Sequence, residues 1–146
     1  MADTEENAPV DWNQMIIKEF RENGGKVGGQ FEGATLALLT FTGRKSGTPR
    51  TTPVWYMADG DRVVVFGTNA GAPKHPDWYL NVIAEPAVTV EIGTETYPAT
   101  AVPVEGAERD RLFAAAELLA PVFTEYQAKI ERTIPAVAVY RVPSRR

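Results

Sequence analysis

The stretch RTTPVWYMADGDRVVVFGT, residues 50–68, carries the clearest signal of the fold. Its two halves, 50–58 and 62–68, are rich in β-branched and aromatic residues, and the turn signal DGD separates them. Asp-Gly favours the positive φ angles of tight hairpin turns, so this stretch is expected to form a β-hairpin. A connection this short joins antiparallel strands.

The segments on both sides continue the hairpin pattern. Further strands are expected at residues 35–42, 87–93, 95–105 and 134–142. Helices are expected at residues 11–23, 77–85, 107–120 and 121–132, the last two separated by Pro121. Because hairpin connections dominate, we expect a mainly β (α+β) fold. It would be an antiparallel sheet or small barrel with peripheral helices, not a doubly wound parallel sheet.

The N-terminal segment is predicted to be a tail followed by a helix. Residues 1–10 are acidic and are expected to be solvated, unlike a signal or transit peptide. Asp11 and Gln14 resemble a capping box, so the helix would begin at residue 11. Its apolar stripe would contain Trp12, Met15, Ile16 and Phe20. The glycine-rich connector that follows, 24–33, lacks the Gly-Lys-Ser/Thr ending of a phosphate loop and follows no strand, which disfavours that interpretation.

Composition excludes several kinds of site. The 146 residues include no cysteine and one histidine, so thiolate and multi-histidine metal sites are ruled out. A net charge of −4 disfavours nonspecific nucleic-acid binding over a broad surface. No apolar segment approaches the ~18 residues of a membrane helix. These features fit a cytoplasmic protein, with peripheral contact to a membrane as the alternative.

A basic turn lies just before the hairpin. Arg44 and Lys45 stand between glycines, where backbone N–H groups can also converge on an anion. Ser46 and Thr48 add hydroxyl donors, and an arginine fork can hold a phosphate or a carboxylate at two points. The turn is therefore either an anion clamp or a solvated hairpin tip, and the residues alone favour neither.

Three other places carry candidate side chains. Alternation along residues 50–58 puts Trp55 on the opposite face from Tyr56, so one faces the core while the other packs there or lines a cleft. His75 lies next to Pro76 and is more often a structural residue in such a position than a catalytic one. On the last predicted helix, an aromatic pair forms either core or a lid over an apolar pocket: Phe123 and Tyr126.

Three segments together resemble the deazaflavin-dependent nitroreductase family, actinobacterial reductases that use coenzyme F420. They are LLTFTGRKSGTPRTTPVWY at 38–56, AGAPKHPDWYLNV at 70–82 and RTIPAVAVY at 132–140, and the likeness runs from about residue 28 to residue 142. The resemblance implies a split β-barrel, like that of flavin-binding pyridoxamine-phosphate oxidases. It divides the chain into a tail and amphipathic helix, 1–27, and an F420-binding reductase domain, 28–146.

The resemblance also implies roles for the matching residues. The phosphate and polyglutamate tail of F420 would be held by Arg44, Lys45, Ser46, Gly47, Thr48 and Pro49. The deazaflavin ring would lie along Leu38, Leu39, Thr40, Pro53, Val54 and Trp55. It would also lie against Val65, Phe66, Gly67, Thr68 and Asn69, with Lys74 near the tail. The substrate pocket would contain Trp55, Phe123 and Tyr126.

The implied reaction is hydride transfer from reduced F420 to a small electron-poor acceptor: an activated C=C bond, a quinone or a nitro compound. Thr68 and Tyr126 are the candidates for stabilising negative charge on the acceptor. Ala120, Trp55 and Phe123 stand where the family's best-known nitroreductase has tyrosines, so its substrate is not carried over. The alternatives are an FMN-binding reductase of the same fold and a non-catalytic F420 carrier. No nucleic-acid partner and no metal are expected.

Overall fold

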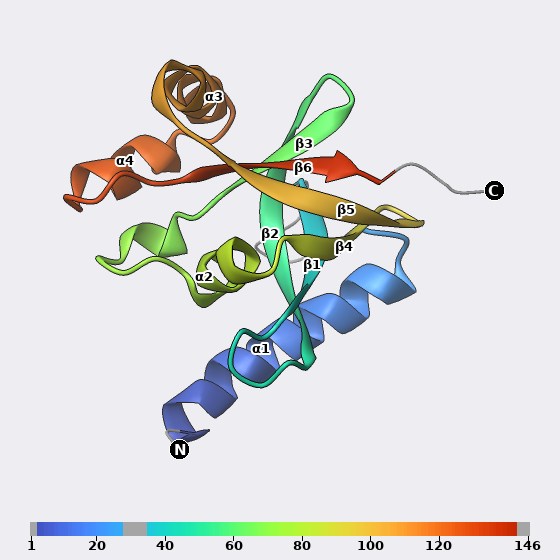
Figure 1. Ribbon diagram of the computed structural model, residues 1–146. Helices are drawn as coiled ribbons and strands as arrows, with labels where there is room; N and C mark the ends of the chain where they lie inside the picture. Colours follow the sequence, from blue (N-terminus) through green and yellow to red (C-terminus); the bar gives the residue numbers. More distant parts are fainter. Residues whose placement is uncertain (1–2, 28–34, 143–146) are drawn as a thin grey trace.

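The computed structural model of the chain describes residues 3–27 and 35–142. The described residues form six strands: β1 (Leu36–Thr42), β2 (Pro49–Asp59), β3 (Arg62–Phe66), β4 (Ala87–Ile92), β5 (Glu95–Val104) and β6 (Ala136–Arg141). They close into an antiparallel barrel in the order β1-β2-β3-β6-β5-β4 (Figure 1). The predicted mainly β fold, a small barrel with peripheral helices, is confirmed.

The hairpin predicted from residues 50–68 is β2 and β3. Asp59 pairs with Arg62 across the turn, and Gly60 takes a φ of +67° there. β3 ends at Phe66, two residues earlier than expected. The chain turns away because Asn69 and Ala70 both adopt positive φ angles, +47° and +54°, which a strand cannot contain.

The barrel interior forms the first of three apolar clusters. Val54 of β2, Val65 of β3 and Val137 of β6 are buried in it, and Trp78 and Val82 of α2 (Asp77–Ala84) pack against them. α2 thereby covers one end of the barrel (Figure 1). Closure of the ladder gives every strand two hydrogen-bonded neighbours, so this interior is sealed by backbone pairing.

The second cluster lies outside the barrel, under α3 (Gly106–Leu119) and α4 (Val122–Ala128). Met57 and Phe66 point outward from β2 and β3 into it, and Trp55 packs at its edge. Val54 and Tyr56, by contrast, contact the interior cluster. The alternation expected along β2 is therefore present, and Trp55 is the aromatic that faces away from the barrel interior.

The third cluster attaches α1 (Asp3–Glu22) to the outside of the barrel. Ile16, Ile17 and Phe20 are buried against Leu38 of β1, whereas Met15 is 64% exposed, so its place in the predicted apolar stripe was wrong. The face of α1 that packs on the barrel therefore includes Ile17 in place of the predicted Met15.

α1 also begins much earlier than predicted. Residues 3–10 are helical, so the helix begins at Asp3 rather than at residue 11, and Asp11 with Gln14 lies inside the helix rather than at its cap. The first turn has the sequence DTEE, and acidic residues favour a helix N-terminus through the helix dipole. Most of the glycine-rich connector, 28–33, lies outside the described residues. Among those described, no helix combines the length and apolarity needed to cross a membrane.

Candidate functional site

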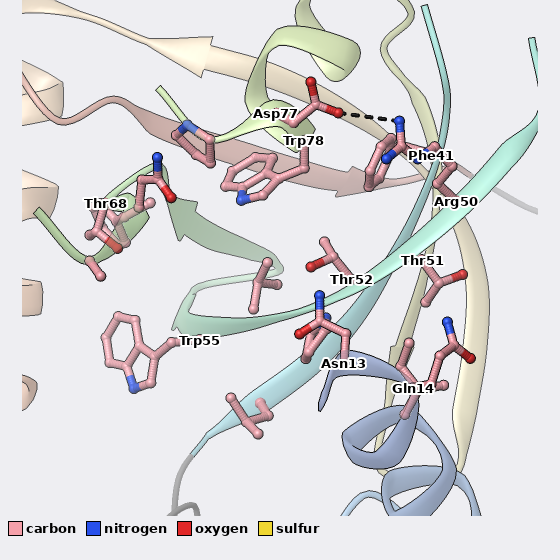
Figure 2. Close-up of a pocket in the computed structure, with 18 of the residues that line it drawn as sticks. Asn13, Gln14, Phe41, Arg50, Thr51, Thr52, Trp55, Thr68, Asp77 and Trp78 are labelled. Carbon is pink, nitrogen blue, oxygen red and sulfur yellow. Dashed lines mark hydrogen bonds and ion pairs between the residues drawn. The ribbon is translucent and has the colours of Figure 1, made fainter. Parts of the chain in front are cut away.

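A groove of about 1150 Å³ runs over the outer surface of the barrel. β2 forms its floor with residues 49–55, and α1, α2, α4 and the loop after β3 supply its walls. Figure 2 shows Asn13 of α1, Thr52 and Trp55 of β2 and Thr68 of the loop around one common space. The groove has a polar end and an aromatic end, which are built differently.

The polar end is organised around Asp77, the first residue of α2. Its Oδ1 accepts a hydrogen bond from Arg44 Nη1 at 3.1 Å. Its Oδ2 accepts one from Arg50 Nη1 at 3.3 Å, the contact that Figure 2 draws as a dashed line. Asn81 Nδ2 donates to Asp77 Oδ2 at 3.0 Å. Burial would raise the pKa of Asp77, but the hydrogen bonds from Arg44 and Asn81 and the two arginine charges lower it below its ordinary value.

Asn81 connects the basic turn to α2. Its side chain is 1% exposed, and its Oδ1 accepts hydrogen bonds from the backbone N of Arg44 at 2.8 Å and from Arg44 Nη1 at 2.9 Å. Both oxygen and nitrogen of this buried amide are therefore satisfied. The position of Arg44 is fixed by α2, so the basic turn is not a free hairpin tip at this residue.

The rest of the basic turn is exposed. Ser46 and Thr48 hydrogen-bond to each other, Oγ to Oγ1, at 2.7 Å. Among the residues with described side chains, Lys45 and Lys74 form no ion pair, so both ammonium groups are available to a ligand.

The aromatic end is a cluster of four rings from β2, β3 and α4. Trp55 meets Phe123 edge-on with ring centroids 5.1 Å apart, and Phe66 lies 5.6 Å from Phe123. Tyr126 adjoins Phe123 at 6.2 Å. These contacts give the groove a rigid apolar wall, with the Tyr126 hydroxyl as a polar group in it.

One arginine holds the loop that forms the third wall. The Arg132 guanidinium donates to the carbonyl oxygens of Gly67 at 3.1 Å, Thr68 at 3.0 Å and Ala72 at 2.9 Å. It also approaches His75 Nδ1 at 3.3 Å. Burial, and to a smaller extent the charge of Arg132, lowers the pKa of His75. The ring is therefore neutral at pH 7, with Nδ1 as the acceptor.

The structure brings nine of the predicted site residues to the groove: Pro49, Pro53, Val54, Trp55, Phe66, Thr68, Asn69, Phe123 and Tyr126. The others lie elsewhere. Leu38 is buried under α1, and Leu39 and Val65 are buried inside the barrel. Thr40 hydrogen-bonds to Thr51, and Gly67 is so close to Pro135 that an added Cβ would lie 2.8 Å from it. Arg44, Lys45, Ser46, Gly47, Thr48 and Lys74 lie outside the groove lining.

Sequence reasoning missed several lining residues. Asn13, Gln14, Ile17 and Arg21 come from α1, and no chemical motif marks them. Four further lining residues lie inside the segments 38–56 and 70–82 but were given no role: Arg50, Thr51, Thr52 and Asp77. Extending the basic turn by one residue beyond Pro49 would have included Arg50. Arg132 is the first residue of the RTIPAVAVY segment, and no other feature of the sequence indicated that it holds the loop.

Comparison with known proteins identifies the family of this chain. Residues 12–141 match the family model described as F420H(2)-dependent quinone reductase. An F420H(2)-dependent quinone reductase of Mycobacterium tuberculosis is 36% identical over 126 residues, which are 84% of this chain and 85% of that protein.

Solved structures with a similar fold include a member of the same functional class and a more distant protein. An F420-H2 dependent reductase is 38% identical with a TM-score of 0.67, covering 72% of this chain and 93% of that one. A Listeria innocua protein assigned as a pyridoxamine 5′-phosphate oxidase is 14% identical with a TM-score of 0.54, over 73% of this chain and 83% of that one. The last likeness concerns the fold alone, and it matches the expected split β-barrel.

Proposed function

This chain belongs to the F420H(2)-dependent quinone reductase family, and we propose that it binds reduced F420 in the groove and reduces a quinone-type acceptor there. Family membership makes the chain an F420-dependent oxidoreductase with a split β-barrel. The proposal concerns the place of binding, the roles of the residues and the acceptor. Activated C=C compounds and nitro compounds are the other acceptors to be compared.

The single observation that supports this proposal best is the difference between the two ends of the groove. Aromatic rings form one end, and Arg50 lines the other, where Arg44 of the adjacent basic turn contacts the same Asp77 carboxylate. F420 is divided in the same way, with a flat ring system at one end and a phosphate and glutamate carboxylates at the other. We assign the phosphate to Arg44 and Arg50, which meet at Asp77, and the carboxylates to the exposed Lys45 and Lys74. The volume of about 1150 Å³ is large enough for a coenzyme together with an acceptor.

At the aromatic end, the residues position the reactants and exclude water. When bound, the reduced coenzyme supplies the hydride. Trp55, Phe66 and Phe123 form an apolar wall against which flat rings are oriented, and bound rings would displace water from it. Thr68 and Tyr126 line the same space, and their hydroxyls are proposed to stabilise the negative charge that develops on the acceptor oxygen.

The proton that completes the reduction is assigned to solvent. Asp77 is the only acidic residue among the described residues that line the groove, and its lowered pKa keeps it ionised at neutral pH. It is therefore not a proton donor. The Tyr126 and Thr68 hydroxyls donate hydrogen bonds without giving up their protons.

The activity is tested by mixing the protein with reduced F420 and menadione and recording the reoxidation of F420. We expect turnover with menadione, and slower turnover with an unsaturated lactone or a nitroarene. Tyr126→Phe should lower kcat more than it changes F420 affinity, since it removes only the hydroxyl. Absence of F420 oxidation across a broad acceptor panel would contradict the proposal.

The binding mode is tested separately by removing single cations. Arg50→Ala and Lys45→Ala should each weaken F420 binding by about 1–3 kcal/mol, the scale of charge-assisted hydrogen bonds. Arg111→Ala is the matched control, because Arg111 lies on α3 away from the groove lining. F420 affinity that is unchanged in the Arg50→Ala, Lys45→Ala double variant would place the coenzyme elsewhere.

A further inference from the structure

The polar end of the groove contains an anion of its own at the place where the coenzyme phosphate is proposed to bind. We propose that Asp77 makes the site selective by charge: it permits the singly charged phosphodiester of F420 and disfavours the doubly charged phosphate monoester of FMN. This inference rests on the proposed function. It assigns a specificity-determining role to a residue that lies in the 70–82 segment but was given no part in the predicted site.

The geometry that supports this role is the sharing of one carboxylate by two guanidinium groups. Asp77 contacts Arg44 through Oδ1 and Arg50 through Oδ2, at 3.1 and 3.3 Å. The three groups together carry a single net positive charge. A monoanion neutralises that cluster, whereas a dianion leaves a surplus negative charge next to a carboxylate.

The two phosphates differ in this respect at neutral pH. A phosphodiester has one ionisable oxygen and carries one negative charge. A phosphate monoester has a second pKa near 6 and therefore carries about −1.5 to −2 at pH 7. The extra charge would lie close to Asp77, where Coulomb repulsion is only partly screened by solvent. The glutamate carboxylates of F420 follow on a flexible tail, within reach of Lys45, which is exposed and outside this cluster.

Asp77 is not the only group that holds the basic turn in place. The buried Asn81 also holds it, with two hydrogen bonds from Arg44 to its Oδ1. The Asp77 side chain is 53% exposed and lines the groove, which suits a group that meets a ligand rather than one that supports the fold. Asp77→Asn removes the charge and keeps one oxygen acceptor, which at the Oδ2 position serves Arg50 and Asn81 Nδ2. Its NH2 group then replaces Oδ1, so the bond from Arg44 Nη1 is lost, while Arg44 keeps its two bonds to Asn81.

The experiment compares Asp77→Asn with wild type in titrations of F420, FMN and riboflavin at pH 8. The preference for F420 over FMN should fall about tenfold in Asp77→Asn, because the variant gains FMN affinity. Riboflavin, which has no phosphate, should bind the two proteins equally. Asp77→Glu keeps the charge and should keep the preference. Asp61→Asn removes one negative charge from the exposed β2–β3 turn and should change nothing. Thermal unfolding of each variant verifies that it is folded.

Each other result is decisive as well. Equal changes in F420 and FMN affinity would overturn the inference, as would FMN binding that stays undetectable in Asp77→Asn. A loss of preference in Asp77→Glu equal to that in Asp77→Asn would show that shape rather than charge governs the site. Tight F420 binding with an unchanged preference would contradict only this inference. Failure of wild type to bind F420 would contradict the proposed function too.

Discussion

Arg132 shows how much one side chain contributes to the groove. The loop it holds contains two consecutive non-glycine residues with positive φ, Asn69 and Ala70, and such conformations persist only where surrounding contacts enforce them. Asn69 adds one contact of its own, from Nδ2 to the Lys74 carbonyl at 3.0 Å. Backbone bonds from Gly71 N to Thr68 O and from Ala72 N to Asn69 O close the turn itself. The Arg132 guanidinium adds to these by donating to three carbonyl oxygens that lie up to five residues apart.

Arg132→Ala is therefore expected to lower the free energy of unfolding by about 2–3 kcal/mol, since several carbonyl oxygens lose their donor at once. Denaturation in guanidinium chloride measures this loss. F420 affinity should fall as well, because the loop carries Thr68. Arg111→Ala, at an arginine whose side chain is 60% exposed, should change stability by no more than about 0.5 kcal/mol. Equal effects of the two substitutions would contradict the role given to Arg132.

His75 makes the same loop sensitive to pH. Its pKa in the folded protein is lowered from 6.5, so the unfolded chain takes up a proton more readily than the folded one. Its contribution to stability is complete above the unfolded pKa of 6.5 and is lost as pH falls from there towards the folded pKa. Protonation would also convert Nδ1 from an acceptor into a donor facing Arg132.

Lowering the pH from about 7.5 to about 5.5 should accordingly reduce the Tm of wild type by roughly 2–4 °C more than that of His75→Asn. The asparagine offers an uncharged oxygen to Arg132 at both pH values. Differential scanning calorimetry at the two pH values checks this. If the variant and wild type lose the same Tm, the acid sensitivity comes from other groups.

At the scale of elements, α1 both packs on the barrel, as its amphipathic pattern predicts, and lines the groove. It packs on β1 through Phe20 and its neighbours, and Arg21 forms two hydrogen bonds to Glu91 of β4, at 3.0 and 2.7 Å. Asn13 and Gln14 then face the groove. The helix is thus fixed at its C-terminal half by apolar and charged contacts and contributes a wall of the site.

Phe20→Ala should lower the free energy of unfolding by about 3–5 kcal/mol, because it leaves a cavity where a ring now is 1% exposed. Met15→Ala on the same helix provides the matched control, with an expected change within about 0.5 kcal/mol. Chemical denaturation of both variants measures the difference. A small effect at Phe20 would mean that α1 is held mainly by the pair of Arg21 and Glu91.

The elements could be predicted from sequence where the signal is local. The β2–β3 hairpin follows from alternation and Asp-Gly, and α2 from Pro76 and Asp77, because turn and cap preferences act between near neighbours. The start of α1 could not be placed, since the capping pattern at Asp11 competed with an acidic first turn eight residues earlier. Local patterns do not decide between two acceptable helix starts.

At the scale of the whole molecule, the chain is acidic while its proposed ligand is anionic. The net charge of −4 is spread over the surface, and the cations of the polar end act within a few ångströms. At 0.1 M salt, charges more than about 10 Å apart are largely screened from each other. Short-range attraction should therefore outweigh the long-range repulsion.

F420 affinity is expected to fall severalfold when NaCl is raised from about 50 mM to about 500 mM, because added salt weakens the remaining attraction. Fluorescence titration at a series of salt concentrations measures this. Riboflavin, which is uncharged, should show little dependence. An F420 affinity that rises with salt would mean that the net charge of the chain governs binding.

The site could be predicted only in part, because some of its contacts depend on how the whole molecule folds. Trp55, Phe123 and Tyr126 were recognisable because aromatic residues on one strand face or one helix face are visible in sequence. The meeting of Arg50 with Asp77, 27 positions later, depends on closure of the barrel and on where α2 packs. Such long-range contacts leave no periodic pattern in the chain.

One consequence follows from the way the groove shares its floor with the barrel. Phe41 and Val54 belong both to the groove lining and to the barrel interior, so changing them alters folding and binding together. Across the groove, three lining residues lie outside the barrel: Ala120 and Tyr126 are partly buried, and Val122 is exposed. Evolution can therefore change the acceptor through substitutions in the α4 wall, while the barrel side of the groove preserves folding. A search for variants with a new substrate should randomise Ala120, Val122 and Tyr126 first.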